Sequence, residues 1–192
     1  MHDDSTAPGA GDAEQRWALV LDPAWQPTAE GEAPPIEAVL GAWALDSDGV
    51  TGPFRANPGY VPSGPGSPTD PVDAAVRGAA RGEHDEAAVL ATMRDALFGI
   101  ALDEQGAAIV APAPDDVPSV LVTTSPAHTW RVDAPTWQEI TAKDLADSLP
   151  AEGVDLLLNP GAPESMRIAA IAFKTVVADT DPVVLGDPPF PA

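Results

Sequence analysis

Two short apolar runs, each stopped by polar turn residues, constrain the fold more than any other feature of this sequence. One is Val120-Leu121-Val122, followed by Thr123-Thr124-Ser125-Pro126, and the other spans 154–158, followed by Asn159-Pro160-Gly161. A short continuous apolar run between turn signals is typical of a buried strand. The sequence therefore predicts two buried strands that end in polar turns.

The other segments carry both strand and helix signals. Residues 17–21 and 137–141 predict short strands, whereas residues 36–45 permit either a helix or a strand. The hairpin signal Asp46-Ser47-Asp48-Gly49 follows directly, so we favour a strand for 36–45.

Helical periodicity appears in three places. The residues predict a helix pair over 71–98 that begins at an Asp70 cap, a helix that begins with a Thr141/Asp144 capping box, and a helix over 166–177 capped by Ser165. Strands interleaved with grouped helices predict an α+β fold. We expect a single mixed β-sheet with helices packed on it, together with an N-terminal strand and hairpin extension.

The composition divides the chain into four regions. We expect a disordered acidic tail at 1–15, a strand, hairpin and Pro-rich loop at 16–69, an α+β domain at 70–177, and a Pro-rich C-terminal tail at 178–192.

The charge balance limits the possible partners. Thirty acidic and nine basic side chains give the 192 residues a formal net charge of −21. Such a surface repels phosphate backbones and anionic headgroups, so we expect no nucleic-acid or membrane-surface role. The negative charge either keeps the protein soluble or attracts a partner with a basic surface. Because no leader pattern and no long apolar run are present, we expect a cytoplasmic protein without membrane insertion.

No residue pattern indicates catalysis. Cysteine is absent, and the histidines His2, His84 and His128 lack metal-ligand spacing. Ser125 and His128 could act as nucleophile and base, but no Gly-x-Ser-x-Gly elbow surrounds Ser125. We therefore expect no enzyme activity, no cofactor and no metal.

The polar ends of the two buried strands form one candidate site. Pockets in open sheets lie at the carboxyl ends of strands, so Thr124, Ser125 and Asn159 are candidate pocket residues for a small ligand. A structural alternative is that Pro160 and Gly161 form a turn while Asn159 binds nearby backbone.

Aromatic residues form a second candidate site. Trp25, Trp43, Tyr60 and Trp130 are candidate partner-binding residues, because tryptophan is enriched at binding hot spots. Alternatively, these rings anchor loops to the core. Tyr60 lies in a long irregular segment, 57–71, which is either a surface loop or a binding loop.

Several motifs appear in a recognisable order. The helix pair at 71–98 is followed by the segment Gly106 to Pro112 and then by the strand at 120–126, which ends in Thr-Thr-Ser-Pro. The segment 143–150 comes next, with the sequence Lys-Asp-Leu-Ala-Asp-Ser-Leu-Pro. The strand at 154–161, which ends in Asn-Pro-Gly, is the last of the series. In this order they resemble the SseB N-terminal-domain family. With Trp17 to Trp25 and Gly52 to Ser63, residues 17–174 are similar to actinobacterial type VII secretion system-associated proteins.

The resemblance implies an SseB-like α+β domain without enzyme activity. It implies a protein-binding accessory or chaperone-like factor, with a secretion substrate or a secretion component as partner. Two alternatives stay open, namely an immunity-type protein that neutralises a secreted toxin and a small-ligand binder at the strand ends. The oligomeric state is not predicted.

Overall fold

A computed structural model describes residues 16–45, 51–64 and 66–178. The tail predicted at 1–15 and the turn predicted at Asp46 to Gly49 lie outside the described residues, as does the tail predicted at 178–192 except for Ala178, which ends α4. What is described is an α+β fold with two sheets and four α-helices.

The first sheet is antiparallel and three-stranded. Its strands are β1 (Arg16–Leu21), β2 (Val39–Leu45) and β3 (Thr51–Ala56), in that order. The strand prediction for 36–45 is confirmed from Val39 onward, and a single 3₁₀ turn, η1 (Ile36–Ala38), precedes it. The pairing of β2 with β3 is the predicted hairpin, and β1 extends it into a sheet.

The second sheet is mixed and six-stranded. Its path runs β7-β4-β6-β8-β9, with β5 also paired to β6. The strands are β4 (Leu97–Leu102), β5 (Val110–Pro112), β6 (Pro118–Thr123), β7 (Thr136–Thr141), β8 (Asp155–Leu158) and β9 (Met166–Ile168). Only the β6–β8 pair is parallel, so both predicted strand ends lie at the same edge of the sheet.

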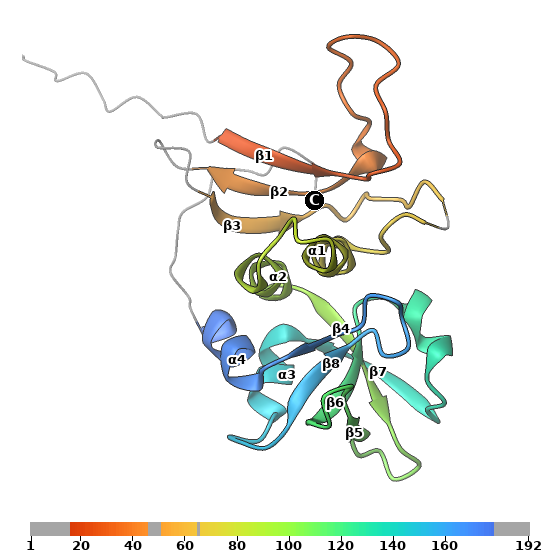
Figure 1. Ribbon diagram of the computed structural model, residues 1–192, viewed down its shortest axis with the longest axis vertical. Coiled ribbons are helices and arrows are strands. Elements are labelled where there is room, and N and C mark those ends of the chain that lie inside the picture. The colour runs from red at the N-terminus through yellow and green to blue at the C-terminus, as the bar shows by residue number, and fades with distance from the viewer. Residues whose placement is uncertain (1–15, 46–50, 65, 179–192) are drawn as a thin grey trace, which may run out of the picture.

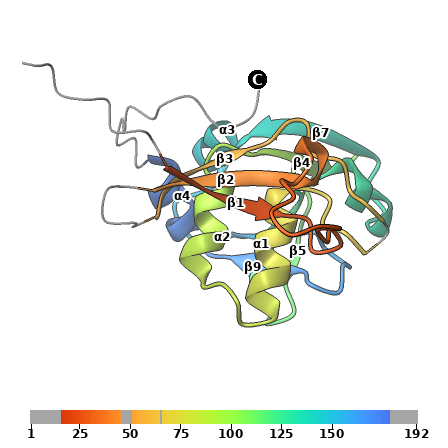
Figure 2. The same ribbon diagram turned by 90° about the horizontal axis from the view of Figure 1, so that it is seen from above.

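The helices pack on one face of the mixed sheet. They are α1 (Pro71–Ala80), α2 (Glu86–Met93), α3 (Ala142–Ser148) and α4 (Ala170–Ala178). In Figures 1 and 2, α1 and α2 lie between the mixed sheet and the three-stranded sheet. The fold is therefore layered as sheet, helix pair and sheet.

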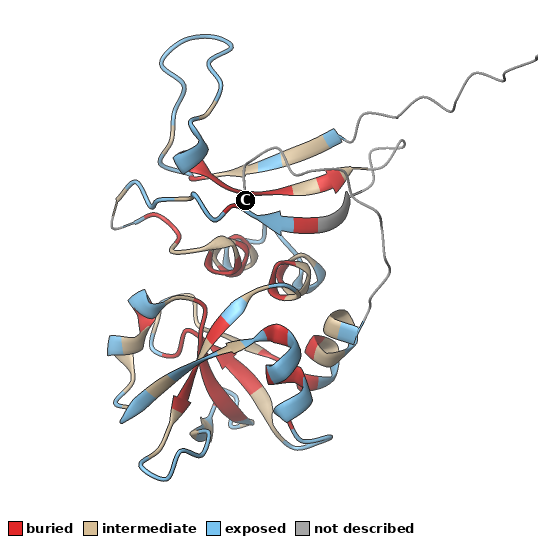
Figure 3. Ribbon diagram, turned by 180° about the vertical axis from the view of Figure 1, so that it is seen from behind, coloured by how far each residue is buried: buried red, intermediate tan, exposed pale blue. Residues whose placement is uncertain are grey.

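Both faces of the two central strands are buried, which explains their continuous apolar sequences. Leu156 and Leu158 face the helices, whereas Leu157 faces a smaller cluster with Leu121 and Ala113. Figure 3 shows burial concentrated in these central strands and on the inner faces of the helices. Parallel strands covered on both sides lose the usual alternation of apolar and polar residues.

The predicted boundary of the helix pair is wrong at its C-terminal end. α2 ends at Met93, and Leu97 and Phe98 lie in β4, although Leu97 continues the helical spacing. A turn in which Ala96 N–H binds the Met93 carbonyl reverses the chain. From Leu97 to Leu102, β4 then pairs with β7 along its whole length, so sheet pairing overrides the local helical pattern.

The predicted helix over 166–177 begins four residues late. Residues Met166–Ile168 form β9, which pairs with β8, and α4 begins at Ala170. The Ser165 hydroxyl caps no helix and instead donates to the Leu158 carbonyl oxygen at 3.0 Å. The Asp155 carboxylate accepts from the Ala170 N–H at 2.9 Å, which marks the helix start.

Two other predicted helix starts are confirmed. Asp70 caps α1 by accepting from the Asp73 N–H, with Pro71 at the first helical position. Thr141 caps α3 by accepting from the Asp144 N–H. Gly78 lies inside α1, and a β-carbon there would overlap the His84 ring.

Candidate functional site

The polar ends of β6 and β8 bind each other. Asn159 Oδ1 accepts from the Thr124 N–H at 2.9 Å, and Asn159 Nδ2 donates to Thr124 Oγ1 at 3.0 Å. Both residues are buried, and Asn159 has a left-handed φ of 46°. Ser125 does not join them, because its hydroxyl accepts from the Ala127 N–H and caps the 3₁₀ helix η2 (Pro126–Arg131).

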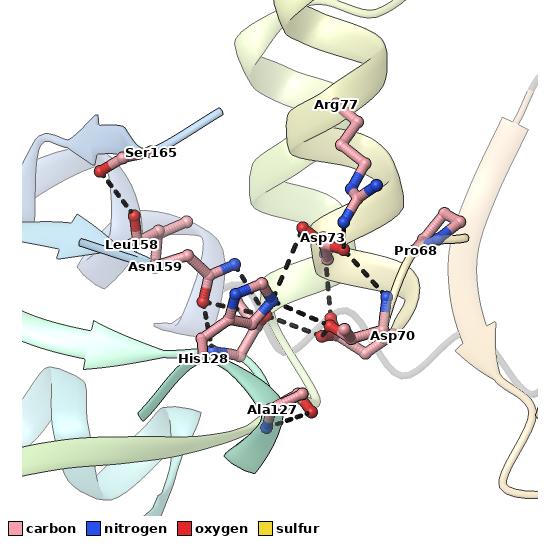
Figure 4. Close-up of polar contacts among 12 residues, drawn as sticks. Pro68, Asp70, Asp73, Arg77, Ala127, His128, Leu158, Asn159 and Ser165 are labelled. Carbon is pink, nitrogen blue, oxygen red and sulfur yellow. Dashed lines mark hydrogen bonds and ion pairs between the residues drawn. The ribbon is translucent and has the colours of Figure 1, made fainter. Parts of the chain in front are cut away.

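The start of α1 completes this polar cluster. Asp70 Oδ2 accepts from the hydroxyls of Thr124 and Thr69, each at 2.7 Å. Burial raises the pKa of Asp70 to about 6, although the hydrogen bonds from Asp73, Thr69 and Thr124 act in the opposite direction. The cluster, drawn in Figure 4, therefore ties α1 to the carboxyl ends of β6 and β8.

His128 lies at the same junction. Its Nε2 atom is 3.0 Å from Thr69 Oγ1 and 3.8 Å from Asp73 Oδ1. Burial lowers the pKa of the His128 imidazole, whereas the nearby Asp73 carboxylate acts to raise it. The Thr69 hydroxyl also donates to Asp70, so Thr69 links His128 to the cap of α1. The other ring nitrogen, Nδ1, is buried and has no hydrogen-bond partner among the residues that the structure describes.

A cleft lies between the three-stranded sheet and the helix pair α1 and α2. This inter-layer cleft has a volume of about 830 Å³. One wall is apolar and belongs to the three-stranded sheet, with Val20, Leu21, Trp43 and Phe54. The facing wall belongs to the helix pair and is lined by small side chains, namely Ala74, Ala75, Ala87, Ala88 and Ala91.

The aromatic wall of the cleft depends on a close approach within the sheet. The rings of Trp43 and Phe54 meet edge to face, with centroids 4.9 Å apart. A β-carbon at Gly41 would overlap the Phe54 ring, so only glycine lets this ring lie across β2. Sequence reasoning identified Trp43 but missed Phe54, because nothing local to Phe54 shows that it faces a cleft.

Charged side chains border the cleft. The Arg77 guanidinium pairs with Asp73 at 2.9 Å and donates to the Gly66 carbonyl oxygen at 3.0 Å. Arg81 makes two bonds of 2.8 Å to the Glu83 carboxylate. His84, Asp85 and Glu164 also line the cleft. The loop between β8 and β9 therefore contributes to a site built mainly from the first 92 residues.

Asp22, directly after β1, fixes the long loop that closes one side of the cleft. Its Oδ2 accepts from the Ser63 N–H at 3.0 Å and from the Ser63 hydroxyl at 2.7 Å. The Tyr60 hydroxyl lies 3.3 Å from the same oxygen and donates to the Pro68 carbonyl oxygen at 2.8 Å. Tyr60 is half-buried and bound within the loop.

This anchoring predicts a pH effect. Burial alone would raise the pKa of Asp22, but the hydrogen bonds from Ala24 and Ser63 outweigh it and lower the pKa from 3.8 to about 2. The folded state therefore favours the carboxylate, and the stabilisation is present above pH 3.8 and lost as the pH falls towards 2. We expect the Asp22 carboxylate to contribute about 1–2 kcal/mol to the free energy of unfolding, once solvent screening is allowed for.

Urea unfolding of the protein and of Asp22→Asn, between pH 5 and pH 2, measures this effect. The difference in unfolding free energy between the two proteins should shrink as the pH falls. Titration of the other carboxylates is common to both proteins and cancels in the difference. A difference that stays constant over this range would show that the Asp22 charge does not hold the loop.

The four candidate aromatic residues do not converge. Trp43 lines the cleft and Tyr60 binds within the loop, whereas Trp25 is half-buried and follows Asp22 in the turn after β1. Trp130 lies on η2, is 74% exposed and has the Arg131 guanidinium 4.5 Å from its ring centroid. Of the four, Trp43 is the one that borders a sizeable space, and Trp130 is the most exposed.

The structure also bears on metals and membranes. Within 16–45, 51–64 and 66–178, no group of three or more His, Asp or Glu side chains could hold a metal ion. Over the same residues, no helix has the length and apolar character needed to cross a membrane.

Comparisons with models of protein families, with curated proteins and with solved structures found no match to this chain. The resemblance to the SseB family therefore stays a prediction from the sequence motifs.

Proposed function

We propose that the chain is a non-enzymatic protein-binding factor, accessory or chaperone-like, associated with type VII secretion, and that its partner binds in the inter-layer cleft. The observation that carries this proposal is the cleft itself. About 830 Å³ is space for several side chains of a partner segment. The sequence resemblance supplies the secretion context.

The wall chemistry supports a protein ligand. The Trp43 and Phe54 rings and the alanines of α1 and α2 offer apolar surface, and the ion pairs at the border offer polar contacts. Protein interfaces combine an apolar centre rich in aromatic residues with a polar rim. The cleft has this arrangement before any partner is present.

The strand-end cluster gives less support to an enzyme. The Ser125 hydroxyl, the candidate nucleophile, accepts from the Ala127 N–H, and His128 Nε2 faces Thr69 Oγ1 at 3.0 Å. A general base needs a free nitrogen towards the nucleophile. The polar atoms of Thr124 and Asn159 likewise bind within the protein. This cluster is better explained as a junction between α1 and the mixed sheet.

Site-specific cross-linking tests the proposed function. A photoreactive residue at Ala88, which lines the cleft, should capture a secretion substrate or component in the native host. The same residue at Glu139, exposed on β7, should not. A secreted toxin as the captured protein would instead support the immunity-type alternative.

Matched substitutions on the helix pair complete the test. Ala88→Trp should obstruct the cleft beside α2 and abolish capture from a second cleft position, Ala91. Ala80→Trp, at the exposed end of α1 and away from the cleft, should leave capture unchanged. Equal capture with both variants would mean that the partner binds elsewhere.

A further inference from the structure

The charges around the inter-layer cleft do not balance. Its two arginines are already neutralised by neighbouring acids, since Arg77 pairs with Asp73 and Arg81 pairs with Glu83. Asp85 and Glu164 also line the cleft. Three carboxylates (Glu83, Asp85 and Glu164) line the cleft beside the two guanidinium groups, and Arg77 is already neutralised by the buried Asp73, so the cleft carries excess negative charge.

Glu164, in the loop between β8 and β9, is one of the carboxylates that line the cleft. It is half-buried, and among the described residues it makes no hydrogen bond or ion pair. Asp85 is partly used, because its Oδ1 accepts from the Ala88 N–H at the start of α2. The charge of Glu164 acts on Arg81, but the Arg81 guanidinium already binds both oxygens of Glu83. The Glu164 carboxylate therefore still favours a cationic ligand, which replaces the hydration lost on burial.

The walls suit the remainder of a long basic side chain. Lysine and arginine have aliphatic stems that pack on apolar surface while the charged group stays near polar groups. The alanines of α1 and α2 leave room for such a stem opposite the Trp43 ring. The face of a tryptophan also attracts a cation directly.

The whole molecule adds a long-range attraction. A formal net charge of −21 draws basic segments towards the surface and speeds their encounter. That attraction is not specific to one place. The cleft adds specificity, since carboxylates, an aromatic ring and an apolar floor lie within one cavity.

We propose that the inter-layer cleft binds a lysine- or arginine-bearing segment of the partner protein, with the aliphatic stem between the alanine wall and Trp43 and the charged group at Glu164 and Asp85. This inference rests on the proposed protein-binding function and names the chemistry of the partner.

Peptide titration tests the proposal. The probes are three 12-residue peptides of matched length in which leucine alternates with lysine, glutamate or serine. Binding to the full chain is measured by calorimetry at 50 mM and 300 mM salt. We expect the lysine peptide to bind more tightly than the other two, and to lose affinity at the higher salt concentration.

Two charge-removing variants separate the cleft from the general surface charge. Glu164→Gln should weaken binding of the lysine peptide about fivefold, whereas Glu139→Gln on β7 removes the same charge and should have no effect. Equal weakening by both variants, or none by Glu164→Gln, would overturn the proposal.

The two proposals fail in different ways. Capture of a secretion protein at Ala88 without binding of the lysine peptide would keep the proposed function and reject a basic segment as the ligand. Specific binding of the lysine peptide without capture at Ala88 would keep the basic specificity of the cleft and reject the secretion partner.

Discussion

Replacing Phe173 by alanine should lower the free energy of unfolding by about 3–5 kcal/mol. The Phe173 side chain has no exposed surface and lies in the main core between α4 and the mixed sheet. Its ring meets Phe98 of β4 edge to face, with centroids 6.1 Å apart and planes at 86°. Alanine would remove this contact and leave a cavity that the rigid sheet cannot close.

Ile171 provides the matched control on the same helix. It is 71% exposed, so Ile171→Ala should change the unfolding free energy by less than about 0.5 kcal/mol. Urea unfolding followed by tryptophan fluorescence measures both variants. If Phe173→Ala does not fold, Phe173→Leu keeps most of the volume and should lose about 1–2 kcal/mol. Similar losses for Phe173→Leu and Ile171→Ala would contradict the assigned core.

The sequence predicts the central sheet well because its signals are local. The apolar runs ending at Thr124 and Asn159 are buried strands, as expected, and they lie side by side. The boundary between α2 and β4 could not be predicted in this way, since Leu97 satisfies the helical spacing. Only the partner strand β7, some 40 residues later, decides the conformation there.

The sites were harder to predict than the strands. Thr124 and Asn159 were identified, but their partner Asp70 is 54 residues from Thr124 and carries only a helix-capping signal. The inter-layer cleft exists only when the three-stranded sheet packs above the helix pair, so its walls share no sequence motif. Trp43 was chosen for its residue type, and Glu164 had no signal at all.

The tripeptide Asn-Pro-Gly occurs twice, and each copy follows a strand. Asn57 comes after β3, and its Nδ2 donates to the carbonyl oxygens of Ile36 and Val39 at 2.8 and 2.7 Å. Asn159 comes after β8 and binds Thr124. Both asparagines are buried. The same tripeptide therefore fixes a strand end in each sheet.

Asn159→Ala should lower the free energy of unfolding by about 3 kcal/mol. The substitution leaves the buried Thr124 N–H without its acceptor, which costs about 1–3 kcal/mol. It also places alanine at a φ of 46°, where a β-carbon adds about 1 kcal/mol. Chemical denaturation monitored by circular dichroism measures the loss.

Glycine separates the two contributions to this loss. Asn159→Gly removes the same hydrogen bonds but tolerates the left-handed backbone, so it should be about 1 kcal/mol more stable than Asn159→Ala. Asn57 is not left-handed, so Asn57→Gly should be no more stable than Asn57→Ala, because glycine costs extra backbone entropy there. The order of the glycine and alanine variants should therefore reverse between the two sites. Equal stability of Asn159→Gly and Asn159→Ala would show that hydrogen bonding alone, and not the backbone conformation, selects asparagine at the end of β8.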